Sequence, residues 1–517
     1  MKFVMSALLA AALAAGSIPD APAQAAQAAQ PERLDKKNAR AKALMEGLDH
    51  ERLWGDEAYA KKQLARIEAA LTEPVEHRFA VPLTHARTVA LMALRRDEEA
   101  LEASRALVGH APEAPFIYGV PLIILAQTGR EIESVGFLEA AARHVTGADL
   151  PEFRRRLFGD LISRLFNGLP PMAESDARGR FAEALLTLQW PDPARTSKLD
   201  IMRLVAARAR LARGDAQGAR ALAAALVEPH SAILLVASSD TDALLDPSAD
   251  RVKRVEEAIR AHDEETQAWL KRNPDSRAAI LDRARFLRSV GREEDALALL
   301  LPHATDTEAL EGDEDARWIA NEAAYALLAL DRADEAVAVM ERLARLDPDK
   351  HPGLVAQLIN YGDMLILAGR HAAAAEHLAK LDAQYSRLAS DIGRMWLWSK
   401  AACAHWLRGD AAGTASWLAK VEAKSSTNRP AHSEALVCLD RADDAEKVMM
   451  ERLRSEEGDF IIVGFQNYTL GPAGTEVDRL LRARRKALIA RPAVAAEIAR
   501  KGRSLSLPLS KAYWGGY

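Results

Sequence analysis

The chain has 517 residues, which is too long for one compact hydrophobic core, so several domains or an elongated repeat array are expected. Lysine plus arginine number 69 and aspartate plus glutamate number 74, which gives a formal net charge of −5. Because proteins that bind nucleic acids carry a basic surface, this balance argues against a nucleic-acid partner.

The composition is that of a helical protein. Hydrophobic residues make up 49% of the chain, aromatic residues make up 5%, and 103 residues are alanine. A large β-sandwich or barrel would need more β-branched and aromatic residues, and a disordered chain would lack this apolar content. An all-α fold is therefore predicted.

The first residues have the pattern of a secretory signal peptide. Lys2 is followed by an apolar run over residues 3–15 and by small residues around 21–25. The run is shorter than the roughly 20 residues that an uncleaved membrane anchor needs. We assign residues 1–25 to a signal peptide and 26–48 to a tether or frayed first helix. No later stretch has 18 uncharged apolar residues, so we expect a periplasmic or secreted protein without a membrane span after signal removal.

The chain has two cysteines, Cys403 and Cys438, which fall on separate expected helices. They could form a disulfide or remain as buried free thiols. Two cysteines contribute little to a helical protein of this size, so the free thiols are the favoured interpretation.

Eight short turns share one pattern. Each follows an apolar helical stretch, begins with Gly, Asp or Arg, and is followed five positions later by a small residue. The first turn residue and the small residue are Arg95 with Ala100, Gly129 with Ser134, Gly214 with Ala219, Gly291 with Ala296, Asp331 with Ala336, Gly369 with Ala374, Gly409 with Thr414, and Asp440 with Ala445. Glycine at a helix C-terminus adopts the left-handed conformation that ends the helix, and small residues let two helix axes approach closely. Each turn is therefore predicted to join a helical hairpin.

One of these hairpins resembles a known repeat. The stretch 320–348, with Tyr325, Ala336 and Pro348 around the turn at 331–332, is similar to a tetratricopeptide repeat (TPR). The turns at 95 and 129 are 34 residues apart, the period of that family, whereas other steps differ. The resemblance implies an all-α fold, an α-solenoid or right-handed superhelix of TPR-like helical hairpins, in an exported bacterial TPR protein.

The turns also divide the chain. We predict an N-terminal TPR-like array over 49–230, a degenerate repeat region over 231–276, a C-terminal TPR array over 277–455, and a capping segment and tail over 456–517. Hairpins without the turn signature are expected between the turns at 129 and 214, with helices over 150–166 and 172–190. The last repeat of a solenoid leaves an apolar face, which is why a cap is expected after it. Residues 505–517 are expected to be extended.

Motifs for catalysis or metal binding are lacking. The sequence contains neither a phosphate-binding glycine loop nor a Gly-x-Ser-x-Gly elbow. Cys403 and His405 are two residues apart, and His371 and His377 are six apart, so neither pair shares a helix face. The acidic run 308–315 lacks the pattern of a calcium loop. No catalytic residue, metal or cofactor is predicted.

A candidate binding surface remains. In the C-terminal array, the first helix of each hairpin carries a stripe at steps of three and four residues, which keeps one face. The TPR resemblance implies that such stripes form a concave face that binds an extended peptide or a partner helix. Asparagines and cations would bind backbone and carboxylate groups, and aromatic rings would add contact area. The predicted site residues are Arg285, Arg288, Asn321, Tyr325, Asn360, Asp363, Lys400 and Trp406. Trp318, Trp396 and Leu328 on the same stripe are equally suited to the core between repeats.

Three hypotheses for function follow. The leading one is an exported, non-enzymatic scaffold that binds a protein or peptide of the bacterial cell envelope. The second is a cell-wall or glycan-active all-helical enzyme with paired carboxylates. Few aromatic residues and only about 60 residues after the last repeat argue against it. The third is a permanent structural partner of an outer-membrane assembly machine.

Overall fold

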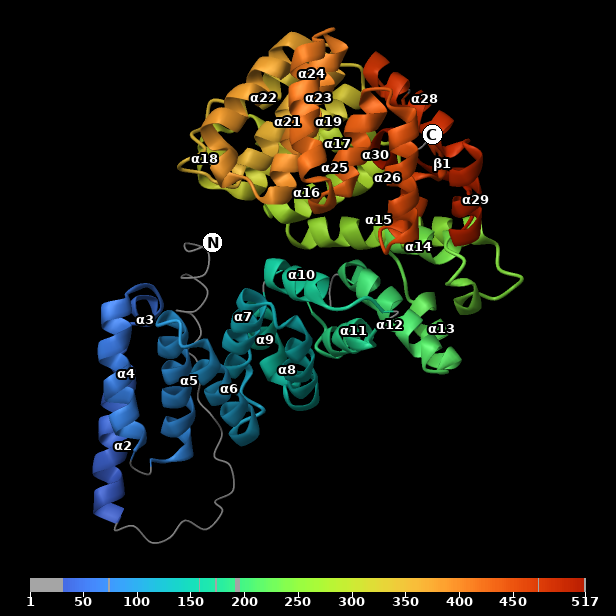
Figure 1. Cartoon of the computed structure of the whole chain (residues 1–517). Helices are drawn as coiled ribbons and strands as arrows, with labels where there is room; N and C mark the ends of the chain where they lie inside the picture. Colours follow the sequence, from blue (N-terminus) through green and yellow to red (C-terminus); the bar gives the residue numbers. More distant parts are fainter. Residues whose placement is uncertain are drawn as a thin grey trace. The chain divides into compact units, whose positions relative to one another are not determined.

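The computed structural model describes residues 31–515, apart from 73–74, 158, 173, 191–195 and 473. The predicted signal peptide and residues 26–30 of the tether lie outside the described residues. The described residues form two compact units, unit 1 up to Ala225 and unit 2 from Leu226, and both are almost entirely helical (Figure 1). The predicted all-α fold of TPR-like hairpins is confirmed.

Unit 1 begins with a helix, α2, that packs against α4 and α5. The helices of unit 1 are α2 (Pro31–Glu46), α3 (His50–Gly55), α4 (Glu57–Leu71), α5 (His77–Ala93), α6 (Asp97–His110), α7 (Gly119–Thr128), α8 (Glu131–His144), α9 (Leu150–Arg156), α10 (Gly159–Gly168), α11 (Ala177–Thr187), α12 (Asp200–Ala212) and α13 (Ala216–Ala224).

Unit 2 contains five regular hairpins and a more varied C-terminal part. Its helices and strands are α14 (Pro229–Ala237), α15 (Arg251–Arg272), α16 (Arg277–Ser289), α17 (Glu293–Ala304), α18 (Thr307–Gly312), α19 (Glu314–Ala329), α20 (Ala333–Leu343), α21 (Leu354–Leu367), α22 (His371–Tyr385), α23 (Asp391–Leu407), α24 (Ala411–Ala423), α25 (Arg429–Cys438), α26 (Ala442–Arg454), α27 (Gly458–Gly464), β1 (Asn467–Leu470), α28 (Glu476–Ile489), α29 (Pro492–Lys501), β2 (Ser506–Ser510) and α30 (Lys511–Trp514). None of the helices that the structure describes is long and apolar enough to cross a bilayer.

All eight predicted turns join two consecutive helices, and the first residue of every turn has a positive φ, between 58° and 84°. The N–H of the next residue then bonds the carbonyl five residues back, as from Arg130 to Leu125 at 3.0 Å. This bond satisfies a carbonyl that the end of the helix would leave without a partner. Glycine supplies five of the turns, whereas Arg95, Asp331 and Asp440 adopt the same conformation as non-glycine residues.

The small residues lie where the paired helices touch. Seven of the eight positions that follow the turns by five residues are buried, and Thr414 is half-buried. At Gly362, seven residues before its turn, an added Cβ would lie 2.4 Å from Leu378 Cδ2. Because real Cβ atoms do not come that close, the distance between α21 and α22 depends on this glycine.

The less regular regions differ from the sequence expectations. The helix expected over 150–166 is broken into α9 and α10, because buried Leu157 is extended and its carbonyl accepts a bond from Trp190 Nε1 at 2.9 Å. The expectation that residues 505–517 are extended is only partly correct. Strand β2 pairs in parallel with β1, matching Asn467 with Ser506, and the chain then turns into the short helix α30.

Residues 476–514, from α28 to α30, form what we call the C-terminal segment, and it joins the first and last hairpins of unit 2. Helix α29 packs against α26 of the last hairpin. Gly502 forms an isolated antiparallel β-bridge with Ser238, which lies just after α14. Arg503 binds both carboxylate oxygens of Asp242, at 2.7 and 2.6 Å. Trp514 Nε1 donates to the carbonyl of Ser289 at 3.1 Å. The segment therefore closes unit 2 on itself.

The favoured interpretation of the cysteines as free thiols is wrong. Cys403 and Cys438 form a disulfide with a Cα–Cα distance of 5.6 Å, and both residues are buried. The hairpins place α23 against α25, which brings residues 35 positions apart into bonding distance. Spacing along the sequence does not reveal this contact between neighbouring repeats.

Candidate functional site

All eight predicted site residues lie in unit 2, on the first helices of four successive hairpins, α16, α19, α21 and α23, and α25 is the first helix of the next hairpin. These helices contact their neighbours in chain order. We call the face that carries these residues, together with Glu322 and Glu434, the inner face. Its charged side chains pair across neighbouring helices.

The first cluster of the inner face is built around a buried arginine. Arg288 pairs with Glu322 of the next hairpin and with Glu293, whose Oε2 lies 3.1 Å from Arg288 Nε. Arg285 Nε lies 3.1 Å from Glu322 Oε1. Burial opposes the charge on Arg288, but the two carboxylates raise its pKa above the ordinary value. Burial also raises the pKa of Glu293, against the effect of Arg288.

Polar and charged side chains of the next helices, α19, α21 and α23, form a row of contacts beside this cluster. The Tyr325 hydroxyl donates to Asp363 Oδ2 at 3.5 Å, and Lys400 Nζ lies 2.8 Å from Asp363 Oδ1. Burial and the neighbouring Asp363 and Glu322 carboxylates raise the pKa of Tyr325 well above its usual value. Beside this row, Asn360 Nδ2 donates to Asn321 Oδ1 at 2.9 Å. The two predicted asparagines are therefore bonded to each other.

The row ends on the C-terminal helix α28. Glu434 of α25 lies between two cations, with Oε1 at 3.2 Å from Lys400 Nζ and Oε2 at 3.0 Å from Arg485 Nη2. Burial would raise the pKa of Glu434, but Arg485 and Lys400 outweigh it and lower the pKa far below the ordinary value. Burial would lower the pKa of Lys400, but Asp363 and Glu434 raise it.

Two further contacts place the C-terminal segment on the inner face. The Arg484 guanidinium lies 4.4 Å from the ring centre of Trp406 and donates to the carbonyl of Cys438. At the other end, the Arg288 guanidinium lies 5.4 Å from the ring centre of Tyr513 in α30. The predicted site is therefore covered at both ends by the chain itself.

The structure thus brings together all of the predicted site residues, and each of them contacts another residue of unit 2. Whether they bind a partner remains a prediction. Sequence reasoning missed Glu434, which stands six residues before the turn at 440, at the stripe position of one further repeat. It also treated α28 as a cap, although the adjacent Arg484 and Arg485 match the acidic and aromatic groups of the stripe.

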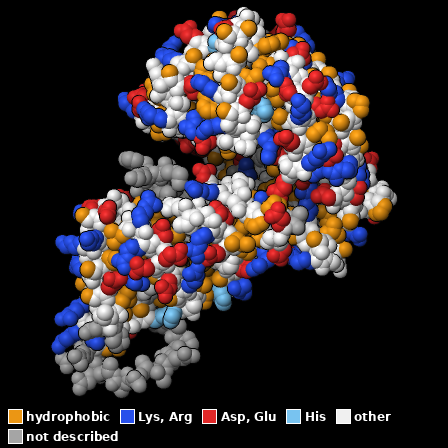
Figure 2. Space-filling view, viewed as in Figure 1, with side chains coloured by type: hydrophobic (Ala, Val, Ile, Leu, Met, Phe, Trp, Pro, Cys, Tyr) orange, Lys and Arg blue, Asp and Glu red, His pale blue; other side chains and the backbone are white. Residues whose placement is uncertain are grey.

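The charged and amide side chains of the inner face do not form a cluster typical of a metal site. Among the residues that the structure describes, no group of three or more His, Cys, Asp or Glu side chains is arranged to hold a metal ion. On the face of the molecule shown in Figure 2, acidic and basic side chains are interspersed. Local pairs therefore dominate the electrostatics visible there.

No protein-family model and no curated protein sequence matches this chain. Three solved structures are similar at low identity. They are Naa15/Naa10 bound to HypK-THB (12% identity, 83% of this chain, 70% of that chain, TM-score 0.23), the APC/C hetero-tetramer Cut9–Hcn1 (12%, 91%, 93%, 0.28) and the human IFIT1 dimer with m7Gppp-AAAA (11%, 86%, 95%, 0.29).

Proposed function

We propose that the protein is an exported, non-enzymatic helical-repeat scaffold that binds a protein of the bacterial cell envelope through the inner face of unit 2. The observation that carries this proposal is the position of α28, which the face binds with a half-buried carboxylate, Glu434, and a tryptophan, Trp406. A helix laid along a groove is a common mode of peptide recognition. The C-terminal segment then holds the position that a helix of the partner would take.

The disulfide supports export. Disulfides persist in oxidising compartments such as the periplasm and are rare in the cytosol. Cys403 and Cys438 are paired and buried, as expected of a structural bond. The apolar run near the N-terminus supports the same compartment from independent residues.

The pairing of the carboxylates supports a binding role over the glycan-active alternative. A glycosidase needs two carboxyl groups that face the substrate across a cleft. On the inner face, Glu322 pairs with two arginines, Asp363 with Lys400, and Glu434 with Lys400 and Arg485. These carboxylates bind cations of neighbouring helices and so hold the helices together.

The test uses the full exported chain with a photo-crosslinker on the inner face. In the Arg484→Ala/Arg485→Ala variant, the C-terminal segment loses two of its anchors, so we expect crosslinking to one envelope protein to increase. A matched variant, Arg342→Ala/Arg345→Ala, removes two exposed arginines from the α20 region and should behave as the wild type. The proposal would be contradicted if neither the wild type nor the Arg484→Ala/Arg485→Ala variant crosslinked to an envelope protein, or if the two crosslinked equally.

Export is tested separately by thiol alkylation in intact cells. The wild-type chain should have no alkylatable cysteine until it is reduced under denaturing conditions. A chain that lacks residues 2–22 should remain in the cytosol with both thiols reactive after denaturation. Reactive thiols in the full-length chain would contradict the proposed compartment.

A further inference from the structure

Unit 1 has a hollow on its surface, and all of the residues that line it belong to unit 1. Helices α6, α8 and the start of α11 line an open hollow with a volume of about 470 Å³. This is within the range of about 300–1,000 Å³ found for ligand pockets. The apolar lining comes from Val108, Val135, Phe137 and Ala177, and Ile132 stands at the edge with 53% of its surface exposed. An isoleucine this exposed beside an apolar hollow is a feature of interaction surfaces.

A glycine lies beside the hollow. Gly136 lies in the middle of α8, and a Cβ added there would meet no atom within 4 Å. Glycine inside a helix is unfavourable compared with alanine, and no close neighbour explains its presence here. Gly136 lies one turn after Ile132, so both face the hollow. The helix thus gives up stability at a position from which a long side chain would enter the hollow.

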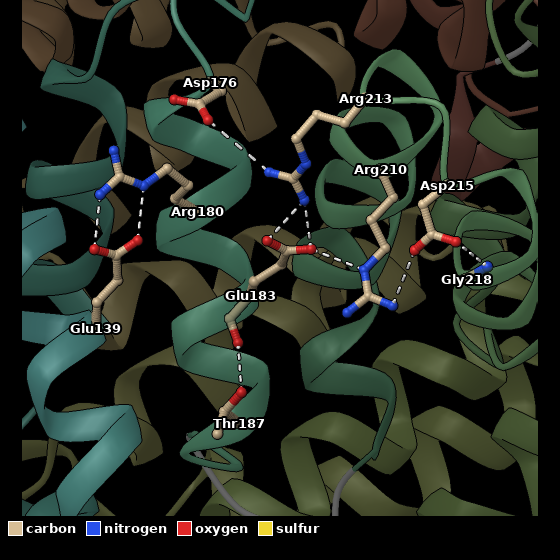
Figure 3. A network of polar contacts seen from close by, with 9 residues as sticks. All are labelled: Glu139, Asp176, Arg180, Glu183, Thr187, Arg210, Arg213, Asp215 and Gly218. Atoms are coloured by element: carbon tan, nitrogen blue, oxygen red, sulfur yellow. Dashed lines mark hydrogen bonds and ion pairs between the residues drawn. The ribbon is translucent and has the colours of Figure 1, made fainter.

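Two arginines stand at the edge of the hollow. Arg105 pairs with Glu133 at 2.7 Å. Arg180 pairs with Glu139 at 2.7 Å, and Figure 3 shows this second pair. In both pairs the arginine is the more exposed partner, at 49% against 34% and at 43% against 27%. Hydrogen bonds from Arg130 and then Arg105 lower the pKa of Glu133, and the hydrogen bond from Arg180 lowers the pKa of Glu139. The charged lining consists of two arginines and one glutamate, Glu133.

The arginines retain donors for a ligand. Arg180 uses Nε and Nη2 on Glu139, and Arg105 uses Nη2 on Glu133. A guanidinium has five N–H donors, so each arginine has further donors to offer. The carboxylates fix the guanidinium groups at the edge, so a ligand carboxylate would meet donors that are already oriented.

The ion pairs beyond the hollow fix its wall. Glu183 of α11 binds Arg210 of α12 and Arg213, which directly follows α12, and Arg210 also approaches Asp215 just before α13 (Figure 3). Helix α11 is thus tied to α8 on one side and to α12 on the other. The hollow is therefore formed before any ligand binds.

We infer that this hollow binds a peptide segment with one bulky apolar side chain flanked by carboxylates. The apolar side chain enters over Gly136 and contacts Ile132, and the carboxylates bind the outward donors of Arg105 and Arg180. This inference rests on the proposed scaffold function. It adds a second binding site, in unit 1, for a peptide of stated chemistry.

The test selects displayed random peptides on the full oxidised chain and measures the enriched peptides by fluorescence anisotropy. We expect enrichment of a bulky apolar residue flanked by Asp or Glu. Gly136→Glu, which places a side chain and a negative charge in the hollow, should weaken binding more than tenfold. Gly136→Ala fills little of the space and favours the helix, so it should retain binding and unfold at the same or a higher urea concentration. Arg105→Gln/Arg180→Gln should weaken acidic peptides and leave peptides with neutral flanks unaffected.

Three results would overturn the inference: no enriched peptide, enriched peptides with basic flanks, or binding that Gly136→Glu leaves unchanged. The unfolding midpoint of Gly136→Glu, measured beside Gly136→Ala, identifies any loss of binding that comes from unfolding. Capture of an envelope protein by the inner face is measured with the wild-type chain as well. If that capture is present while the wild-type chain enriches no peptide, the hollow is refuted and the scaffold function stands.

Discussion

Replacing Glu434 by glutamine removes the central negative charge of the inner face without changing the shape of the side chain. Glu434 lies between Lys400 and Arg485, so the variant leaves two cations facing a neutral amide. We expect unit 2 to lose stability and the C-terminal helix α28 to loosen, because its arginine loses its partner.

The magnitude follows from burial. Breaking a buried ion pair by removing one partner costs about 3–5 kcal/mol. The side chains of Glu434, Lys400 and Arg485 are 25%, 14% and 30% exposed, and Lys400 keeps Asp363 at 2.8 Å. Solvent and this second partner reduce the loss, so we expect a decrease of about 2–4 kcal/mol in the free energy of unfolding at pH 7.

The assay is urea unfolding followed by tryptophan fluorescence. Seven of the nine tryptophans lie at or beyond residue 269, so the signal reports mainly on unit 2. The pH dependence gives a second test. The pKa of Glu434 is lowered in the folded state, so its stabilisation is present above the unfolded value of about 4.3 and is lost as the pH falls toward the lowered one. The difference between wild type and variant should therefore shrink below about pH 4.

A matched control is the exposed pair of Arg332 and Glu335, at 2.8 Å on the surface of α20. Glu335→Gln should not change stability measurably, because exposed pairs contribute little. An unchanged unfolding midpoint for Glu434→Gln, or a loss that stays constant from pH 7 to pH 3, would refute the account of the inner face.

Three further predictions test the packing. Ala336→Leu inserts a large side chain where α20 packs against α19, and it should lower the unfolding free energy by about 1–3 kcal/mol in urea; no loss would show that the repeat frame is misplaced. Replacing both Cys403 and Cys438 by alanine opens the disulfide and should cost about 2–4 kcal/mol in the same assay, whereas equal stability of the oxidised wild type would contradict a constraining bond. Gly502→Ala would place a Cβ 2.2 Å from the carbonyl oxygen of Ala237, so limited trypsin digestion should cleave the C-terminal segment faster; an unchanged digestion rate would contradict the close approach.

The sequence alone predicted the features that depend on neighbours along the chain. A turn at a helix end is decided by a few adjacent residues, so all eight turns could be located from Gly, Asp or Arg followed by a small residue. The positions of the small residues between paired helices could be predicted as well. The turn that joins the two helices of a hairpin also aligns them, so it fixes which residues face each other.

Contacts between distant parts of the chain could not be predicted in this way. Arg485 and Glu434 are 51 residues apart, and Arg503 and Asp242 are 261 apart. Such pairs depend on where the hairpins place each helix, and no local pattern records that position. The disulfide is of the same kind, since Cys403 and Cys438 meet only when α23 and α25 pack together.

The sequence by itself thus determined an all-α array of hairpins and the stripe of residues on the first helices. Only the tertiary structure decided that the C-terminal segment contacts both ends of that stripe and that the stripe's charges pair with one another. The physical reason is that helix ends and helix faces are set by residues within a few turns. By contrast, the groups that neutralise a buried charge come from whichever part of the chain folds against it.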